Sequence, residues 1–227
     1  MEANINKNLE ITIGNETYKR IPIKTSLVLP GDNLEDFIVE NTKGLVQQGD
    51  VVFVTEKIVA ITQGRSYPIK DVKPRKLATT LAKYVTKTPH GIGLGMPETM
   101  EMALRECGTF RILLASAAGA VGKLLGRKGD FYRVAGYKAR SIDGPTPKTI
   151  PPFNEYVVLG PIKPNEAARN LSQLIGADVL VVDINDLGGN ILGSSNKSLD
   201  NKLYVNILKD NPLGQESQST PLGIIRK

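Results

Sequence analysis

The sequence predicts a protein of the α+β class, and two observations lead to this prediction. Short apolar runs typical of strands and longer amphipathic segments typical of helices follow one another without the strict strand–helix alternation of a doubly wound sheet. Hydrophobic residues make up 41% of the 227 residues, which is enough for a sizeable core. We therefore expect a single domain over residues 1–227, which can divide into two sub-lobes.

The chain opens with a predicted hairpin, because residues 10–13 and 18–23 alternate around the turn formers Gly14 and Asn15. Further strands are predicted where apolar residues alternate or run without a break. These runs are residues 51–55, 111–115, 131–135, 156–159, 179–182, 205–208 and 222–225.

Helices are predicted where apolar residues recur every three or four positions behind a capping residue or a proline. Asp32 and Glu35 have the spacing of an acidic capping box, which predicts a helix to about Lys43. The other helices are expected at residues 74–84, from residue 97 onward, at 117–126 and at 164–175, the last stopped by Gly176. Strands and helices mixed in this order are typical of an α+β protein.

Residues 179–186 are the stretch around which we expect the fold to be organised. The apolar run 179–182 is typical of a strand buried on both faces, and Asp183, Asn185 and Asp186 follow it. Carboxylate and amide oxygens at the end of a buried strand can bind Mg²⁺ or Mn²⁺. Because Asx residues followed by glycine also form turns, a simple turn is the alternative interpretation.

Composition argues against several kinds of site and partner. The single cysteine, Cys107, excludes an internal disulfide, and the single histidine, His90, argues against a histidine-based zinc site or triad. No apolar run reaches the roughly 20 residues of a membrane helix, and the N-terminus lacks a signal pattern, so we expect a cytoplasmic protein without membrane contacts. The net charge of +6 attracts anions such as nucleotide phosphates, whereas an aromatic content of 5% does not favour nucleic-acid binding.

Two short segments invite a phosphate-binding interpretation. Residues 119–123 end in Gly-Lys, but they lack the earlier glycine and the following Ser or Thr of a phosphate-binding loop. Glu56 and Lys57 come directly after the strand expected at 51–55. They are either a solvated strand end or a position that sets a lysine beside a phosphate.

Several stretches, spread over nearly the whole chain, together resemble one family. These stretches are residues 20–23 with 31–34, 49–59 with 64–65, 135–136, 159–161 with 167–169, Asp183, and 214–215 with 220–226. They are similar to the motifs of the coenzyme F420-0:L-glutamate ligases, which add γ-linked glutamate to a deazaflavin coenzyme with GTP and a divalent metal. The resemblance implies a γ-glutamyl ligase-like fold with mixed, largely antiparallel sheets and flanking helices, in a homodimer.

The resemblance also implies a reaction and its site. GTP would phosphorylate a substrate carboxylate, the glutamate amine would attack the acyl phosphate, and Mg²⁺ or Mn²⁺ would bridge phosphate oxygens. The nucleotide side would consist of Pro22, Ile23, Glu56, Lys57, Gly214 and Gln215. By the resemblance, the metal ligands would be Asp183 and Gln215. The residues themselves offer further oxygen donors in Asn185 and Asp186, and Asp143 would replace a metal-binding carboxylate that the family has and this chain lacks, if its loop folds back.

The chain departs from the family pattern at several positions. Lys138 stands where the family has a metal-binding Asp, and Ile61 stands where it has a second lysine. Residues 187–191 replace a basic segment that follows the metal-binding Asp. Two interpretations therefore stay open: a ligase with a changed, small anionic acceptor, or a relative that binds a nucleotide or another anion without catalysis, with Lys138 as a fixed positive charge.

Overall fold

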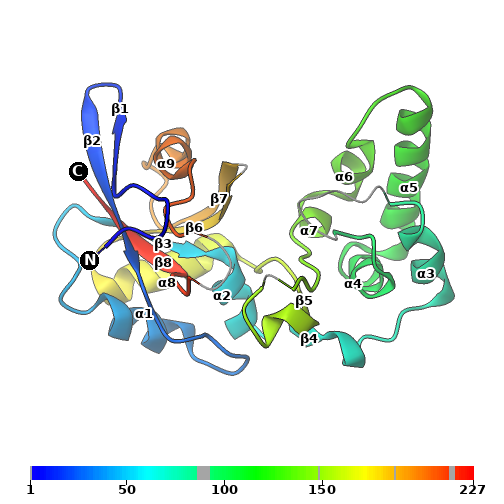
Figure 1. Ribbon diagram of the computed structural model, residues 1–227, viewed down its shortest axis with the longest axis horizontal. Coiled ribbons are helices and arrows are strands. Elements are labelled where there is room, and N and C mark those ends of the chain that lie inside the picture. Colours follow the sequence, from blue (N-terminus) through cyan, green and yellow to red (C-terminus); the bar gives the residue numbers. More distant parts are fainter. Residues whose placement is uncertain (1, 86–92, 148, 187, 215–217) are drawn as a thin grey trace. The chain divides into compact units, whose positions relative to one another are not determined.

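The computed structural model describes residues 2–85, 93–147, 149–186, 188–214 and 218–227 (Figure 1). Contacts within the chain divide it into two compact units. Unit 1 consists of residues 1–64 and 161–227, and unit 2 consists of residues 65–160. Unit 2 is therefore an insertion in unit 1, and each unit is described by itself below. The expected organisation as one domain with two sub-lobes stays a prediction.

Unit 1 is built on one mixed sheet, which in the described residues has the strand order β1-β2-β8-β3-β6-β7. Its strands are β1 (Glu10–Ile13), β2 (Glu16–Ile23), β3 (Val51–Thr55), β6 (Asp178–Asn185), β7 (Gly188–Ser194) and β8 (Leu222–Arg226). The central strands β3 and β6 run parallel, and every other neighbouring pair is antiparallel. The expected α+β class with largely antiparallel strands is confirmed.

Helices cover both faces of this sheet (Figure 1). Helix α9 (Asn201–Leu208) packs Ile207 and Leu208 against Phe53 of β3 and Leu180 of β6, in one buried apolar cluster. Helices α1 (Leu34–Thr42), α2 (Glu56–Thr62) and α8 (Pro164–Ile175) contact one another on the other face. Residues 179–182 are completely buried between these two layers, as their unbroken apolar run predicts.

Two glycines allow close packing in unit 1. A Cβ added at Gly223 of β8 would lie 2.6 Å from Phe53 Cζ and 2.8 Å from the Ile21 carbonyl oxygen. A Cβ at Gly193 of β7 would lie 2.3 Å from the Pro164 carbonyl carbon, so the missing side chain lets the start of α8 rest on β7.

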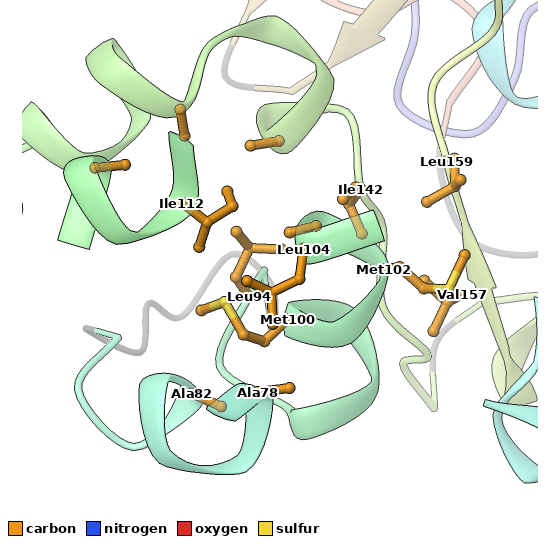
Figure 2. Close-up of a cluster of buried hydrophobic side chains, with 14 of the residues drawn as sticks. Ala78, Ala82, Leu94, Met100, Met102, Leu104, Ile112, Ile142, Val157 and Leu159 are labelled. Carbon is orange, nitrogen blue, oxygen red and sulfur yellow. The ribbon is translucent and has the colours of Figure 1, made fainter. Parts of the chain in front are cut away.

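Unit 2 is mainly helical. Its helices are α3 (Lys76–Ala82), α4 (Pro97–Cys107), α5 (Thr109–Leu124), α6 (Asp130–Ala135) and α7 (Tyr137–Arg140), and short 3-10 turns lie at Ile69–Asp71 and Phe153–Glu155. The short strands β4 (Ser66–Pro68) and β5 (Tyr156–Val158) pair antiparallel. Figure 2 shows the unit's core, in which Ile112 of α5 lies with Leu104 and Met100 of α4. Among the described residues, no helix combines the length and the apolar character that a bilayer crossing needs.

Three predicted strands are helices in the structure. Residues 111–115 belong to α5, residues 131–135 to α6 and residues 205–208 to α9. Each run is short and mostly apolar, which predicts a strand, but a helix with apolar residues on more than one face produces the same pattern. The helix predicted at 117–126 is confirmed as the second half of α5, which ends at Leu124.

Element boundaries differ in smaller ways. Helix α1 is capped by Asn33, whose side chain accepts from the backbone N–H groups of Glu35 and Asp36, and not by Asp32. Asp32 instead accepts from the Leu29 backbone N–H at 2.7 Å. The stop predicted at Gly176 is confirmed, because this residue caps α8 in the left-handed conformation.

Candidate functional site

At one edge of the unit 1 sheet β2 and β3 end and β8 begins, and the central strand β6 runs three residues further. Thr55 and Val182 are partners in the parallel β3–β6 pair, so the next residues along each strand, Glu56 and Asp183, follow at the same edge. The antiparallel strand β8 begins there, since the Thr55 backbone N–H donates to the Pro221 carbonyl at 2.9 Å. In sheets of this kind ligands bind beyond the carboxyl ends of parallel strands, which makes this edge the candidate site.

The strand β2 also ends at this edge. Its last residues, Pro22 and Ile23, pair with Gly223 and Leu222 of β8. Ile23 is 6% exposed, so the backbone here is fixed by both pairing and burial. The structure therefore brings the segment 22–23, which the resemblance assigned to the nucleotide side, to the same edge as Glu56 and Asp183.

Glu56 and Lys57 form the first turn of α2. A solvated strand end was one of the two interpretations of these residues, but the chain passes directly from β3 into a helix after Thr55. Residues 58–61 are buried under the sheet and hold this short helix in place. Glu56 and Lys57 are both half-buried.

Asp183 and Asn185 lie inside a strand and not in a turn. Strand β6 continues through Asn185, with Asp183 opposite Asn190 and Asn185 opposite Gly188 on β7. Val182 and Ile184 belong to the apolar cluster under α9. Because side chains alternate along a strand, Asp183 and Asn185 project together from the other face, the face covered by α2 and α8.

Asp186 follows the end of β6 and joins a polar network. Its Oδ1 accepts from Lys7 Nζ at 2.8 Å and from Asn211 Nδ2 at 3.3 Å. Asn211 Nδ2 also donates to the Gly214 carbonyl at 2.8 Å, and Lys7 Nζ donates to the Asp210 carbonyl at 2.8 Å. Asp186 is thereby tied to the segment before β8 that contains Gly214.

The N-terminal segment fixes the same loop from a second side. Asn4 Nδ2 donates to the Pro212 carbonyl at 3.1 Å and to Thr220 Oγ1 at 3.0 Å. Gly214 has a φ of +69°, and a Cβ there would lie only 3.0 Å from Gln218 Cγ. Glycine is therefore favoured at this turn by both its backbone conformation and its surroundings. Gln215, the other candidate in this loop, lies outside the described residues.

Sequence reasoning missed the residues that hold this network. Lys7 and Asn4 stand in a polar N-terminal segment with no motif, and Asn211 is one of several polar residues before β8. Their role depends on contacts across as many as 216 positions of sequence, as in the Asn4–Thr220 hydrogen bond. The spacing of residues along the chain gives no indication of such contacts.

Asp143 belongs to unit 2. Its backbone forms a bridge with Val158, with N–H to carbonyl distances of 2.8 Å and 3.0 Å in the two directions. Lys138, which stands where the family has a metal-binding Asp, also lies in unit 2 and contacts Glu106 Oε1 at 3.1 Å. The same oxygen contacts Arg65 Nη2 at 2.9 Å. Within this unit, Glu106 is the acidic partner of two basic residues, a role that the sequence did not indicate.

A divalent metal at the site edge would need oxygen ligands from the protein. In the part of the chain that the structure describes, no three or more His, Cys, Asp or Glu side chains are grouped so as to hold an ion. Asp183 and Asn185 nevertheless offer a carboxylate and an amide oxygen from one strand face. Mg²⁺ commonly binds through one or two carboxylates together with substrate phosphates and water, so this pair fits a nucleotide-bound ion.

The fold and this edge together define a mixed α/β protein with a candidate phosphate- and metal-binding site at the ends of its central strands. The family model of F420-0:gamma-glutamyl ligase matches residues 22–193, and the chain belongs to that family. A comparison with curated proteins found no match. The matched region includes Glu56, Lys57, Asp143 and residues 183–186, whereas the loop with Gly214 follows it.

Proposed function

We propose that the protein is a metal- and GTP-dependent γ-glutamyl ligase that forms an amide bond on a small anionic acceptor. The observation that carries this proposal is the meeting of Glu56, Asp183 and the start of β8 at one edge, given by the Thr55–Val182 register and the Thr55–Pro221 hydrogen bond. Family membership supports ligase chemistry, and this edge is where the chain offers groups for a nucleotide and an ion.

The proposed reaction has two steps that balance without a further reagent. An acceptor carboxylate oxygen attacks the γ-phosphorus of GTP, and GDP leaves. The glutamate amine then attacks the acyl carbon, and inorganic phosphate leaves as the amide bond forms. In phosphoryl transfer, enzymes gain most of their rate acceleration by positioning the reactants and by stabilising the negative charge of the phosphate oxygens. A bound Mg²⁺ or Mn²⁺ would contribute to the second of these.

Each part of the edge has a proposed role in this reaction. Asp183 and Asn185 would hold the metal that accompanies the nucleotide, with Asp186 beside them. Lys57 would offer a compact positive charge to a phosphate. Residues 22–23 and the loop with Gly214 would form the walls on the nucleotide side. Gln215 remains a proposed metal ligand on the family resemblance alone, and Asp143 remains a proposed replacement for the carboxylate that Lys138 displaces.

The test is calorimetric titration of GTP into the full-length protein, first with Mn²⁺ and then with a chelator. We expect binding that needs Mn²⁺ and that falls at least about tenfold in Asp183→Asn, a loss of about 1.4 kcal/mol. Asp200→Asn is the matched control, because it makes the same charge change at the N-cap of α9, where asparagine caps as well as aspartate does. Phosphate release with glutamate and candidate acceptors would then identify the acceptor.

Two outcomes would count against the ligase. If no nucleotide binds with Mn²⁺ present, the proposal is wrong. If GTP binding is unchanged by the chelator and by Asp183→Asn, the alternative is favoured. The protein would then be a relative that binds nucleotide or another anion without metal-dependent catalysis. We also propose a homodimer in the cytoplasm, the first from the family resemblance and the second from the sequence.

A further inference from the structure

The side-chain amide of Asn4 joins the two ends of the loop that precedes β8. Its Nδ2 donates to the Pro212 carbonyl at 3.1 Å and to Thr220 Oγ1 at 3.0 Å, so both amide hydrogens are used. Thr220 Oγ1 in turn donates to the Leu213 carbonyl at 2.5 Å. The loop is therefore closed across its base by a link in which Asn4 is the shared donor.

One end of this link leads to the β3 side of the candidate site. Thr220 is 7% exposed and is followed by Pro221, whose carbonyl accepts from the Thr55 backbone N–H at 2.9 Å. Glu56 comes directly after Thr55 and begins α2. A shift of Thr220 would therefore move the start of β8 against the end of β3.

The other end of the link leads to the β6 side. Pro212 follows Asn211, whose Nδ2 donates to Asp186 Oδ1 at 3.3 Å and to the Gly214 carbonyl at 2.8 Å. A Cβ added at Gly214 would meet the Asn4 Cβ at 3.4 Å, an ordinary contact distance. One amide group thus ties together the segments that flank the site on two sides.

The same loop contains backbone conformations that need outside support. Asn211 and Ser219 have φ angles of +52° and +53°, in the left-handed region that is unfavourable for residues other than glycine. The buried Oδ1 of Asn211 also receives no hydrogen bond from the described residues. Such strained positions persist only where the surroundings fix them, and they are typical of sites that are pre-organised for a ligand.

We propose that Asn4 is a positioning residue for the nucleotide, which holds the loop before β8 in the conformation that binds GTP. The inference rests on the proposed function, because GTP is its ligand. Asn4 acts through Pro212 and Thr220, and its loss leaves the loop to be ordered at the expense of binding free energy. All three residues lie outside the region 22–193 that the family model matches, so this contact belongs to the part of the chain beyond that match.

The first experiment titrates GTP with Mn²⁺ into the full-length wild-type protein and into Asn4→Ala by calorimetry. We expect the dissociation constant to rise at least about tenfold with the binding stoichiometry unchanged. A role in stability alone would do the reverse, because partial unfolding lowers the stoichiometry and leaves the affinity of the folded molecules as it is. Asn8→Ala is the matched control, since Asn8 lies in the same segment with an exposed side chain, and should alter neither quantity.

A second variant tests the route from Asn4 to the site. Thr220→Val keeps the shape of the side chain and removes the hydroxyl that connects Asn4 to the Leu213 carbonyl. It should also raise the dissociation constant for GTP. The double variant should bind no more than about twofold more weakly than the weaker single variant, because both changes break one link. Effects that multiply in full would overturn this route.

Hydrogen exchange without nucleotide tests the conformation of the loop. The backbone N–H groups of Gly214 and Thr25 donate to the carbonyls of Asn211 and Ser219, at 3.0 Å each. In Asn4→Ala these two amides should exchange at least about tenfold faster, through local opening. The amides of the buried residues 179–182 should change little, because the centre of the sheet does not depend on Asn4.

Each other result counts against the proposal. Wild-type exchange rates at Gly214 and Thr25 in Asn4→Ala would mean that Asn4 does not hold the loop. A lower stoichiometry at an unchanged dissociation constant would mean a role in stability alone. If the wild-type protein binds GTP and Asn4→Ala binds it equally well, only the positioning role fails. If the wild-type protein binds no GTP with Mn²⁺, the ligase proposal fails and the positioning role fails with it.

Discussion

Lys7 Nζ lies 2.8 Å from Asp186 Oδ1, so a residue of the N-terminal segment neutralises a carboxylate at the candidate site. The lysine side chain is 16% exposed and the aspartate side chain 53% exposed. The ammonium group also donates to the Asp210 carbonyl, which positions it between the end of β6 and the loop before β8. A divalent ion bound near Asp186 would have to share this carboxylate with Lys7.

We predict that Lys7→Met strengthens Mn²⁺-dependent GTP binding. Removing the ammonium takes away one partner of Asp186 and a positive charge that repels the ion, so the affinity should rise roughly three- to tenfold, about 0.6–1.4 kcal/mol. The free energy of unfolding should change by less than about 1 kcal/mol, because the carboxylate of the pair is half exposed. Calorimetry with Mn²⁺ measures the GTP affinity, and urea denaturation measures the free energy of unfolding.

The control for this change is Lys43→Met, which removes an exposed lysine at the end of α1 and should not alter binding. If Lys7→Met weakened nucleotide binding or left it unchanged, Asp186 would not take part in the metal site. Its carboxylate would then serve only to hold the N-terminal segment and Asn211.

A second prediction concerns Arg20, which is completely buried on β2. Its guanidinium donates to the carbonyls of Ile207 and Asn8, at 3.0 Å and 2.7 Å, and pairs with Asp210. Arg20→Met should lower the free energy of unfolding by about 3–5 kcal/mol, because buried carbonyls and an aspartate lose their donor. Lys19→Met, on the exposed side of the same strand, should cost less than about 0.5 kcal/mol in the same urea titration.

Residues 179–182 and α5 show how far sequence patterns predict this fold. The run 179–182 was recognised as a buried central strand because apolar side chains cover both of its faces. In α5 the buried Ile112 and the exposed Leu113 and Leu114 are consecutive, so the same kind of run gave a strand where the chain is helical. Periodicity cannot separate a buried strand from a helix that is apolar on two faces.

The candidate site was predictable only in part, for a similar reason. Asp183 and Asn185 follow an apolar run, and that local signal placed them at the end of a central strand. Which other residues reach the same edge depends on strand order and on contacts such as that of Lys7 with Asp186, 179 positions away. Contacts between residues so far apart leave no repeating pattern in a single sequence.

Glu101 makes the stability of unit 2 depend on pH. Its side chain is 2% exposed on α4 and contacts Arg75 and Arg105 at 3.0 Å and 2.8 Å. Burial alone would raise the pKa of this carboxyl, but hydrogen bonds from Arg75 and Arg105 outweigh it and hold the pKa below its ordinary value. The stabilisation is therefore fully present above the ordinary glutamate pKa of about 4.3 and is lost as the pH falls through the lowered folded value.

We expect Glu101→Gln to lower the free energy of unfolding by about 1–3 kcal/mol at neutral pH, since two guanidinium partners lose a charged acceptor. The difference from the wild-type protein should shrink as the pH falls from the ordinary glutamate pKa of about 4.3 towards the lowered folded value, below which Glu101 is protonated in both states. Urea titrations at several pH values measure this. Glu98→Gln, at the start of the same helix, is the control, and a constant difference at all pH values would contradict the assignment.

The last prediction tests the packing that brings β8 to the candidate site. Gly223→Ala places a methyl group 2.6 Å from Phe53 Cζ and 2.8 Å from the Ile21 carbonyl oxygen. Neither neighbour can yield, because Phe53 is completely buried and Ile21 is paired with Ile224 in the sheet. Overpacking of this kind typically lowers the free energy of unfolding by about 1–3 kcal/mol. We expect a value near the upper end, because the methyl group also meets the Ile21 carbonyl oxygen of the sheet backbone.

Gly14→Ala gives the comparison, because Gly14 has a φ of +62° but no atom within 4 Å of an added Cβ. This substitution should lower the free energy of unfolding by only about 1 kcal/mol, because an L-residue is strained in the left-handed conformation. If the β2–β8–β3 register is as described, Gly223→Ala is the more destabilising of the two in urea titration, and it also weakens nucleotide binding by shifting the start of β8. An equal cost, with nucleotide binding unchanged, would mean that β8 does not lie between Ile21 and Phe53.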